Sequence, residues 1–185
     1  MTLLNISKMG HPVLRQIAAP VSDPTSAEIR ELVENMVETM TEAGGTGIAA
    51  PQVFESKRIF VFFVSEDRAK VEAERLGISI EGEAAVPLTV LVNPEIDFIG
   101  NQIDESWEGC LSIPGLMGKV PRQRSIRYRG LGLDGKLIER EATGFHARVV
   151  QHEYDHLNGV LYPERMTDIK SLIFSSEVGY QKADE

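Results

Sequence analysis

Apolar residues first recur at helical spacing in the stretch from 22 to 45. The positions that share one face of such a helix are Ile29, Leu32, Val33, Met36, Val37 and Met40. Ser22 or Asp23 can cap its N-terminus, and Pro24 suits its first turn. Gly44-Gly45 follows the last apolar position and ends it. The pattern predicts an amphipathic helix whose methionines pack in the core.

Shorter apolar runs in the middle of the chain predict β-strands. One run covers about 58–64 and contains "IFVFFV", and a second, "LTVLVNPEI", covers 88–96. Alternating residues from 125 to 143 predict a hairpin that turns near Asp134-Gly135. The polar stretch at about 65–87 separates the first two strands, and we expect a surface insertion there with one short exposed helix.

A second helix is predicted over about 144–157, ended by Asn158-Gly159, and the amphipathic segment from about 167 to 179 suggests a third. Strands in the middle with helices at both ends predict an α+β fold. At 185 residues the chain suits one domain, residues 1–185, with a core of its own.

The helix over 144–157 carries the pattern H-E-x-x-H, in the stretch "QHEYDHLNGV". Its spacing places His152 and His156 on one face, one turn apart, where both imidazoles can bind one metal ion. Glu153 lies beside them, where a carboxylate can carry a proton to a leaving group. The alternative is a solvated helix face without function. Since Phe145 and Val149 put an apolar stripe on the same side, we favour the metal site.

A catalytic metal site normally has a third protein ligand and one open position. The metalloprotease pattern that places a third histidine six residues after the second fails here, because Tyr162 stands at that position. Other proteases use a downstream glutamate, and by spacing alone Glu164 or Glu177 would serve.

The remaining candidates for the third ligand are His11, His146 and Cys110. His146 lies on roughly the opposite side of the helix from His152 and is a poor partner. Cys110 is either a small buried apolar residue or a thiolate ligand, which a borderline-soft metal binds well. Spacing alone leaves the choice open.

Charge and cysteine content restrict where the protein works. The net charge of -9 argues against binding to duplex DNA, although Arg122, Arg124, Arg127 and Arg129 form a local basic run. A single cysteine permits no internal disulfide and suits a reducing compartment. The N-terminus has no apolar signal segment, and no apolar run is long enough for a membrane. We expect a cytoplasmic protein; an organellar protein that has lost a targeting segment is the alternative.

Three segments together resemble the signature motifs of the peptide deformylase family. They are "GTGIAAPQ" at 45–52, "EGCLS" at 108–112 and "QHEYDHLNG" at 151–159, and "MGHPVLR" near the start adds to the likeness. The resemblance implies an α+β fold with antiparallel strands packed around a central metal-binding helix. It also implies an enzyme that removes the formyl group from the N-terminal methionine of newly made proteins and releases formate.

The resemblance implies the metal ligands as well: Cys110, His152 and His156, holding one Fe2+ that Zn2+, Ni2+ or Co2+ can replace. Its implied partners are N-formylmethionyl nascent peptides and the ribosome, and we expect a monomer that binds neither DNA nor membranes.

Four catalytic roles follow from the resemblance. Glu153 is the general acid/base, and Gln52 donates its side-chain amide to the developing oxyanion, together with the backbone N–H of Leu111. Gly47 lies on the loop that lines the substrate cleft. Arg148, near the metal ligands, departs from the commonest form and is expected to alter the pocket for the methionine side chain.

Three other interpretations compete with this one. A small metallopeptidase would use Glu177 as the third ligand, and an idle homologue would only bind peptides. Gly45, Gly47 and Ala50 also fit a dinucleotide fingerprint, but they follow a helix rather than a strand, and Pro51 opposes a helix start there.

Overall fold

The computed structural model describes residues 2–76 and 85–183. The α-helices are α1 (Ala27–Glu42), α2 (Glu66–Leu76) and α3 (Gly144–Leu157). The strands are β1 (Gly47–Ala49), β2 (Ile59–Val64), β3 (Val86–Phe98), β4 (Ile103–Cys110), β5 (Ile113–Gln123), β6 (Ser125–Leu131), β7 (Leu137–Thr143) and β8 (Ile173–Phe174). Short 3-10 helices are η1 (Pro12–Arg15), η2 (Ala50–Val53), η4 (Tyr162–Glu164), η5 (Ile169–Ser171) and η6 (Ser175–Ala183).

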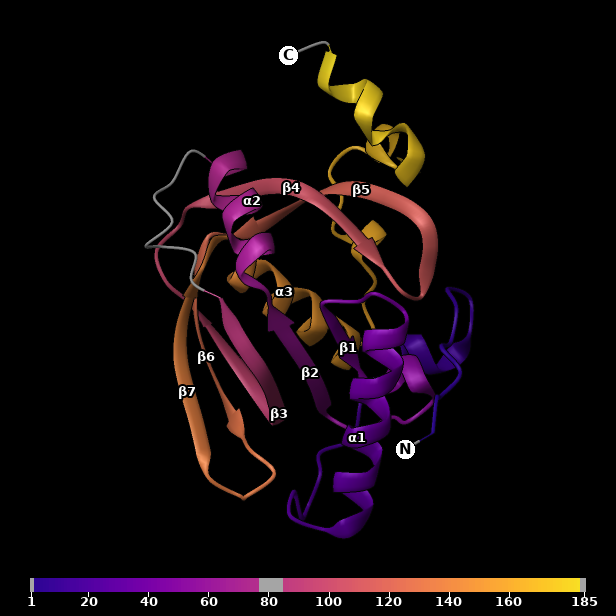
Figure 1. Cartoon of the computed structure of the whole chain (residues 1–185), viewed down its shortest axis with the longest axis vertical. Helices are drawn as coiled ribbons and strands as arrows, with labels where there is room; N and C mark the ends of the chain where they lie inside the picture. The colour runs from indigo at the N-terminus through magenta and orange to yellow at the C-terminus, as the bar shows by residue number, and fades with distance from the viewer. Residues whose placement is uncertain (1, 77–84, 184–185) are drawn as a thin grey trace.

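Two antiparallel sheets enclose α3, which lies between them in the middle of the molecule (Figure 1). The larger sheet has the strand order β1-β2-β3-β6-β7, and the smaller has the order β4-β5-β8. The predicted α+β fold with antiparallel strands around a central metal-binding helix is therefore confirmed in its architecture. The predicted hairpin is the β6–β7 pair, which runs from Ser125↔Thr143 to Leu131↔Leu137.

The larger sheet buries both faces because β2 is apolar at every position. Phe60 and Phe62 point to the side of α3 and pack in one core cluster with Val150. Ile59 and Val61 point to the opposite side and pack against the apolar face of α1. Alternate residues of a strand face opposite sides, so the uninterrupted apolar run seen in the sequence supplies two cores at once.

The start of α1 lies later than predicted. Ser26, not Ser22 or Asp23, is the N-cap, and its Oγ accepts a hydrogen bond from the backbone N–H of Ile29. Asp23 instead accepts from both the N–H and the hydroxyl of Thr25 at 2.8 and 2.7 Å. Because the Asp23 carboxylate is engaged in this local turn, it does not cap the helix, and Pro24 lies before the helix begins. The predicted end was right, since Gly44 follows the helix with a positive φ of 67°.

The sequence prediction also failed at two places around the smaller sheet. The β4–β5 hairpin was missed, because Gly109, Gly115 and Gly118 interrupt its alternation. The C-terminal segment at about 167–179 was predicted to be one helix, but it is helical only in part, since the 3-10 helices η5 and η6 flank the strand β8. The reason is tertiary: Ile173 and Phe174 pair with β5 and complete the sheet.

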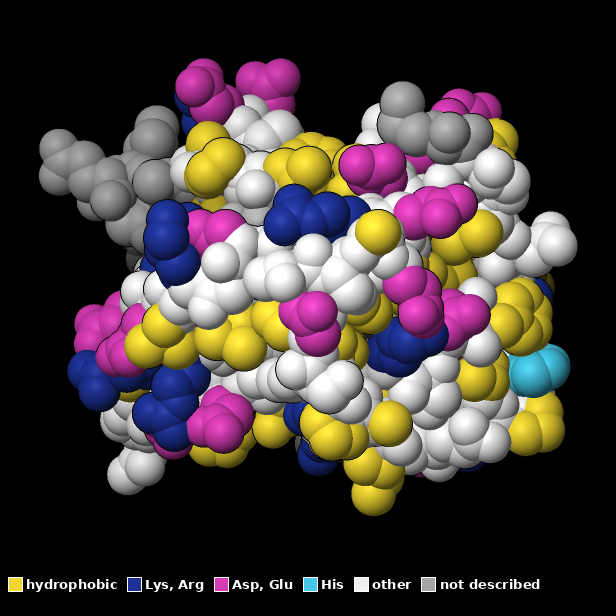
Figure 2. All heavy atoms as spheres, turned by 90° about the horizontal axis from the view of Figure 1, so that it is seen from below, with side chains coloured by type: hydrophobic (Ala, Val, Ile, Leu, Met, Phe, Trp, Pro, Cys, Tyr) yellow, Lys and Arg dark blue, Asp and Glu magenta, His cyan; other side chains and the backbone are white. Residues whose placement is uncertain are grey.

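The structure describes only part of the predicted surface insertion at about 65–87. Its helix α2 was predicted, and residues 77–84 of the same stretch lie outside the described residues. No helix of the described chain is long and apolar enough to cross a membrane. On the face shown in Figure 2, basic side chains alternate with acidic and hydrophobic ones and form no continuous basic surface. The basic run agrees with this, since Arg127 and Arg129 pair with carboxylates of neighbouring strands.

Candidate active site

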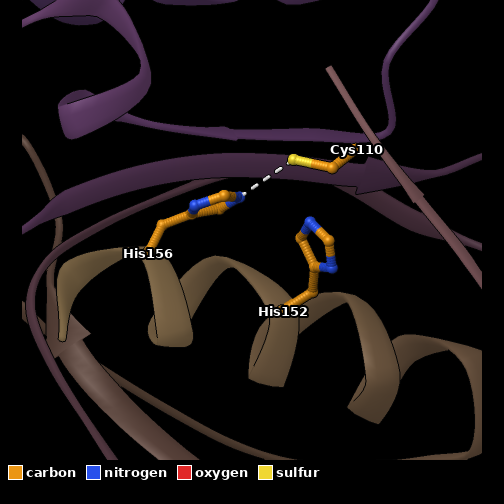
Figure 3. Close-up of side chains that lie close together, drawn as sticks. All are labelled: Cys110, His152 and His156. Atoms are coloured by element: carbon orange, nitrogen blue, oxygen red, sulfur yellow. Dashed lines mark hydrogen bonds between the residues drawn. The ribbon is translucent and has the colours of Figure 1, made fainter. Parts of the chain in front are cut away.

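One group of three side chains that could hold a metal ion stands out among the described residues. Cys110, His152 and His156 place their ligand atoms within 4.8 Å of one another. The two imidazoles rise from adjacent turns of α3, and the thiol approaches from β4 on the other side (Figure 3). The Sγ of Cys110 lies 3.3 Å from the Nε2 of His156. The helix spacing fixes the two histidines, and the β4–β5 hairpin delivers the third group.

The backbone around Cys110 turns its sulfur toward the helix. Cys110 is the last residue of β4, and the β4–β5 register shifts between Gly109 and Cys110. The backbone N–H of Ser112 donates to Sγ at 3.4 Å, and the side-chain amide of Gln52 donates to it at 3.6 Å. These contacts orient the sulfur without occupying the side that faces the histidines.

The three side chains also shift one another's protonation. Burial raises the pKa of the Cys110 thiol, but His156 and His152 beside it outweigh this effect and hold that pKa well below its ordinary value. Burial lowers the pKa of His152, but hydrogen bonds to Cys110 and Glu108 outweigh it and hold that pKa well above the usual range. A thiolate is therefore favoured, which is the form that binds metals.

Glu108 links His152 to a buried network of charges. Its carboxylate is 2.9 Å from the Nδ1 of His152, which leaves Nε2 as the nitrogen for a metal. The same carboxylate accepts two hydrogen bonds from Arg122, both at 2.9 Å, and one from Arg148 at 2.8 Å. Burial opposes ionisation of Glu108, but Arg122 and His152 hold its pKa far below the usual range. Arg122 also pairs with Asp155.

Arg148 lies in this network rather than reaching freely into the cleft. Its guanidinium donates to the backbone oxygens of Val120 and Asp104 at 2.7 and 2.6 Å, besides Glu108. It is 3% exposed, so the charge is enclosed and α3 is tied to both β4 and β5. The expectation that Arg148 changes the methionine pocket stays a prediction; it lines the cleft, with its charge engaged elsewhere.

Glu153 occupies a buried position beside Cys110, His152 and His156. Burial raises the pKa of its carboxyl to about 7, although His152 and His156 pull it down. Its Oε2 has no hydrogen-bond partner among the described residues. A Cβ on Gly47 would lie 2.4 Å from the Oε1 of Glu153. Position 47 therefore has to be glycine for the carboxylate to occupy this place.

Gln52 and Leu111 lie next to the same centre. Gln52 is 1% exposed; its Oε1 accepts the N–H of Ala49 at 2.8 Å, and its Nε2 donates to the Oγ of Ser112 at 3.2 Å. This fixes the amide with its N–H groups toward Cys110. Leu111 follows Cys110 and lines the cleft. A Cβ on Gly45 would lie 2.8 Å from the Leu111 side chain, so this glycine leaves room for it.

The other candidate ligands lie outside the group. His11 caps η1 by accepting the N–H of Val13, and His146 contacts the Tyr128 hydroxyl at 3.1 Å. Glu164 accepts from the N–H of Leu161 and pairs with Arg15. Glu177 is exposed on η6 and accepts from Ser176. A site built with Glu177 as third ligand is therefore wrong for this fold.

A cleft of about 560 Å³ opens onto this centre. Its floor comes from α3, and its walls come from the β4–β5 hairpin, the segment before β1 and the start of α2. The larger apolar side chains of its lining are Ile6, Trp107, Leu111, Ile113, Leu116, Met117, Phe145 and Val149. A peptide with an apolar side chain next to the reacting group fits such a cleft.

Three contributors to the site had no role in the sequence interpretation. Glu108 and Asp155 stood inside quoted motifs, and Arg68 on α2 stood in the insertion; all three now touch the site or its supporting network. The sequence did contain a sign of this network on α3, where the polar residues Arg148, Gln151 and Asp155 recur every three or four positions. Such a polar stripe on a buried helix indicates internal charge partners.

Comparison with known proteins agrees with this geometry. The family model of polypeptide deformylase matches residues 3–172. Peptide deformylase 1 of Bordetella pertussis is 48% identical over 165 residues, which is 89% of this chain and 88% of that protein. Peptide deformylase 1 of Xanthomonas campestris is 45% identical over 175 residues, 95% of this chain and 96% of that one.

Solved structures give the same result. A class I type b peptide deformylase from Acinetobacter baumannii superposes with a TM-score of 0.77 at 38% identity, over 89% of this chain and 99% of that one. The peptide deformylase from Ehrlichia chaffeensis superposes with a TM-score of 0.80 at 33% identity, over 92% of this chain and 91% of that one. The chain therefore belongs to the polypeptide deformylase family and is a metal-dependent hydrolase that removes the formyl group from newly made polypeptides.

Proposed function

We propose that Cys110, His152 and His156 hold one Fe2+, and that the enzyme hydrolyses the formyl group of N-formylmethionyl peptides at this ion. The supporting observation is the convergence of a thiolate and two imidazoles beside a buried carboxylate at the floor of the cleft. One sulfur and two nitrogen donors suit iron, zinc, nickel and cobalt, and three protein ligands leave a position open for water or substrate.

When bound, the metal supplies activation of water and polarisation of the formyl oxygen. The residues supply the rest. Glu153 takes up a proton and delivers it to the departing amine, since its free Oε2 lies at the same centre. Gln52 turns the amide N–H that points to Cys110 toward the oxygen on which charge collects, and the N–H of Leu111 is the second donor. Each donor of this kind is typically worth about 2.7–4 kcal/mol.

The remaining assignments are part of the proposal. Residues 1–185 act as a single catalytic domain, in the cytoplasm and as a monomer, with formylated nascent chains at the ribosome as substrates. The Acinetobacter relative was crystallised with Met-Ala-Ser bound, which is the product that formyl-Met-Ala-Ser would leave. DNA and membranes are not proposed as partners.

The experiment compares formyl-Met-Ala-Ser with acetyl-Met-Ala-Ser as substrates of the purified protein. We expect formate release from the first and hardly any acetate from the second, because the formyl carbon carries only hydrogen where the cleft closes around the carbonyl. Comparable rates on both peptides, or cleavage of an internal peptide bond, would overturn the proposal in favour of a peptidase.

The metal is tested separately. With ferrous iron and a thiolate ligand, activity should decline in air as the iron and Cys110 oxidise, and protein loaded with nickel or cobalt should keep its activity. Full activity for days in air with zinc alone would refute the iron assignment and leave the reaction in place.

A further inference from the structure

The first turn of α2 forms part of the cleft wall. Ala69 is 2% exposed and belongs to the same buried cluster as Phe145 and Val149 of α3. This packing holds α2 against α3. The stretch that the sequence marks as an insertion is therefore attached to the helix that carries the metal-binding histidines.

Arg68 reaches the cleft from this turn. Its guanidinium carbon lies 4.9 Å from the centroid of the Phe145 ring, a stacking arrangement that holds the charged group in place. Both side chains line the cleft that contains His152. Phe145 precedes His152 by two helical turns, so Arg68 lies about 10 Å along α3 from the metal-binding end.

Arg68 is also a charge that the cleft does not balance. Arg148 and Glu108 pair with each other, and Glu153 belongs to the metal-binding end. Lys8 is a second exposed cation of the lining, and its Nζ donates to the backbone oxygen of Leu111. Arg68 forms no ion pair with any side chain that the structure describes. Arg68 and Lys8 thus add two exposed cations to the cleft lining of a protein of net charge -9, whereas Glu66 and Asp67, which precede Arg68 in the first turn of α2, lie outside that lining.

We propose that Arg68 is a specificity-determining residue that binds a carboxylate of the substrate, so that the enzyme prefers formylated chains with Asp or Glu shortly after methionine. The inference rests on the proposed function, since it assumes that the formyl group lies at the metal-binding end. A distance of about 10 Å corresponds to about three residues of extended chain. The preferred acidic residue is therefore expected at position two, three or four of the peptide.

The chemistry favours a carboxylate over other groups. A guanidinium presents several N–H donors in one plane and binds a carboxylate through two of them. Stacking on Phe145 covers a face of that plane and leaves its edge for the ligand. Because Arg68 is exposed, the gain per substrate is modest, roughly two- to fivefold in kcat/KM, and salt should reduce it.

The test uses matched peptides built on formyl-Met-Ala-Ser-Ala, with Glu or Gln at position two, three or four. For wild type we expect the Glu/Gln ratio of kcat/KM to exceed two at one of these positions and to fall with added salt. Arg68→Gln should bring that ratio to about one, and Arg68→Glu should reverse it and favour Lys over Gln there. Arg129→Gln, an equal change of charge on β6, should leave the ratio as in wild type.

Two outcomes would overturn the inference. One is a wild-type Glu/Gln ratio of kcat/KM near one at all three positions. The other is an Arg68→Gln variant that loses kcat/KM equally on Glu and Gln peptides, which would show that Arg68 only packs against Phe145. Failure of the proposed function looks different, because wild type would then release no formate from any formylated peptide.

Discussion

Replacing Glu108 with glutamine tests whether this carboxylate organises the active site. The substitution keeps the shape of the side chain but removes its charge and turns one acceptor oxygen into an NH2 donor. Oε1 accepts from Arg122 and Arg148, and Oε2 accepts from Arg122 and faces His152. With the amide nitrogen in place of Oε1, two contacts place a donor against a donor. With the amide nitrogen in place of Oε2, the contact with Arg122 does so, and the contact with His152 does so as well when its Nδ1 carries the proton.

The magnitude follows from those contacts. A hydrogen bond to a charged group contributes about 1.5–3 kcal/mol, so the loss of one or two predicts a destabilisation of about 1.5–6 kcal/mol. Removal of one partner from a buried ion pair typically costs about 3–5 kcal/mol, which agrees. Glu108 is 5% exposed, so water cannot replace the lost partners. Since His152 also loses the group that orients it, metal affinity should fall about 10–100-fold.

The assay is urea unfolding of the metal-free wild type and Glu108→Gln, with metal analysis of both proteins as purified. Glu141→Gln is the matched control, because Glu141 pairs with Arg127 on the exposed face of the β6–β7 hairpin and its loss should hardly move the unfolding curve. A Glu108→Gln protein with wild-type stability and full metal content would refute the reasoning that buried charges hold this site together.

Five further variants test the other assignments. Cys110→Ala should lose its metal on dialysis and its activity with it, whereas Glu177→Ala should keep both; metal analysis and formate release distinguish them, and the reverse pattern would support a peptidase. Glu153→Gln should lower turnover roughly 10²–10⁴-fold with the metal retained, so more than a tenth of wild-type activity would exclude it as the proton carrier. Gly47→Ala should lower kcat about 100-fold by displacing that carboxylate, and wild-type turnover would contradict the contact. Burial, with a smaller effect of Arg140, lowers the pKa of His146 to about 4. Below pH 6.5, therefore, His146 binds a proton in the unfolded chain but stays neutral in the native state. Stability should therefore fall by about 3 kcal/mol between pH 6.5 and 4, and urea titrations should show a shallower fall for His146→Gln; parallel curves would refute this.

Local sequence determined the elements whose signals lie within one segment. The spacing of His152 and His156 fixed one face of α3, because a helix brings every fourth residue into line. Gly44 and Asp134-Gly135 marked an end and a turn through backbone conformations that few other residues adopt. The α+β architecture followed from the order of these segments.

The third ligand required more than local signals. Reasoning from residues alone left five candidates, and the family resemblance selected Cys110. In the structure, the β4–β5 hairpin brings Cys110 beside His156 across 46 positions of sequence. The hairpin itself escaped prediction because its glycines hide the alternation and its pairing with β8 is long-range.

The tertiary structure alone decided what the charged residues do. The sequence predicted that Arg148 affects the methionine pocket, but its guanidinium donates hydrogen bonds to Glu108 and to the backbone of two strands. In the sequence, Arg68 belongs to a polar insertion predicted to lie on the surface. In the structure, Ala69 packs against α3, and this packing brings Arg68 to the cleft. A charge can be satisfied by a partner anywhere in the chain, so only the folded arrangement determines which partner it finds.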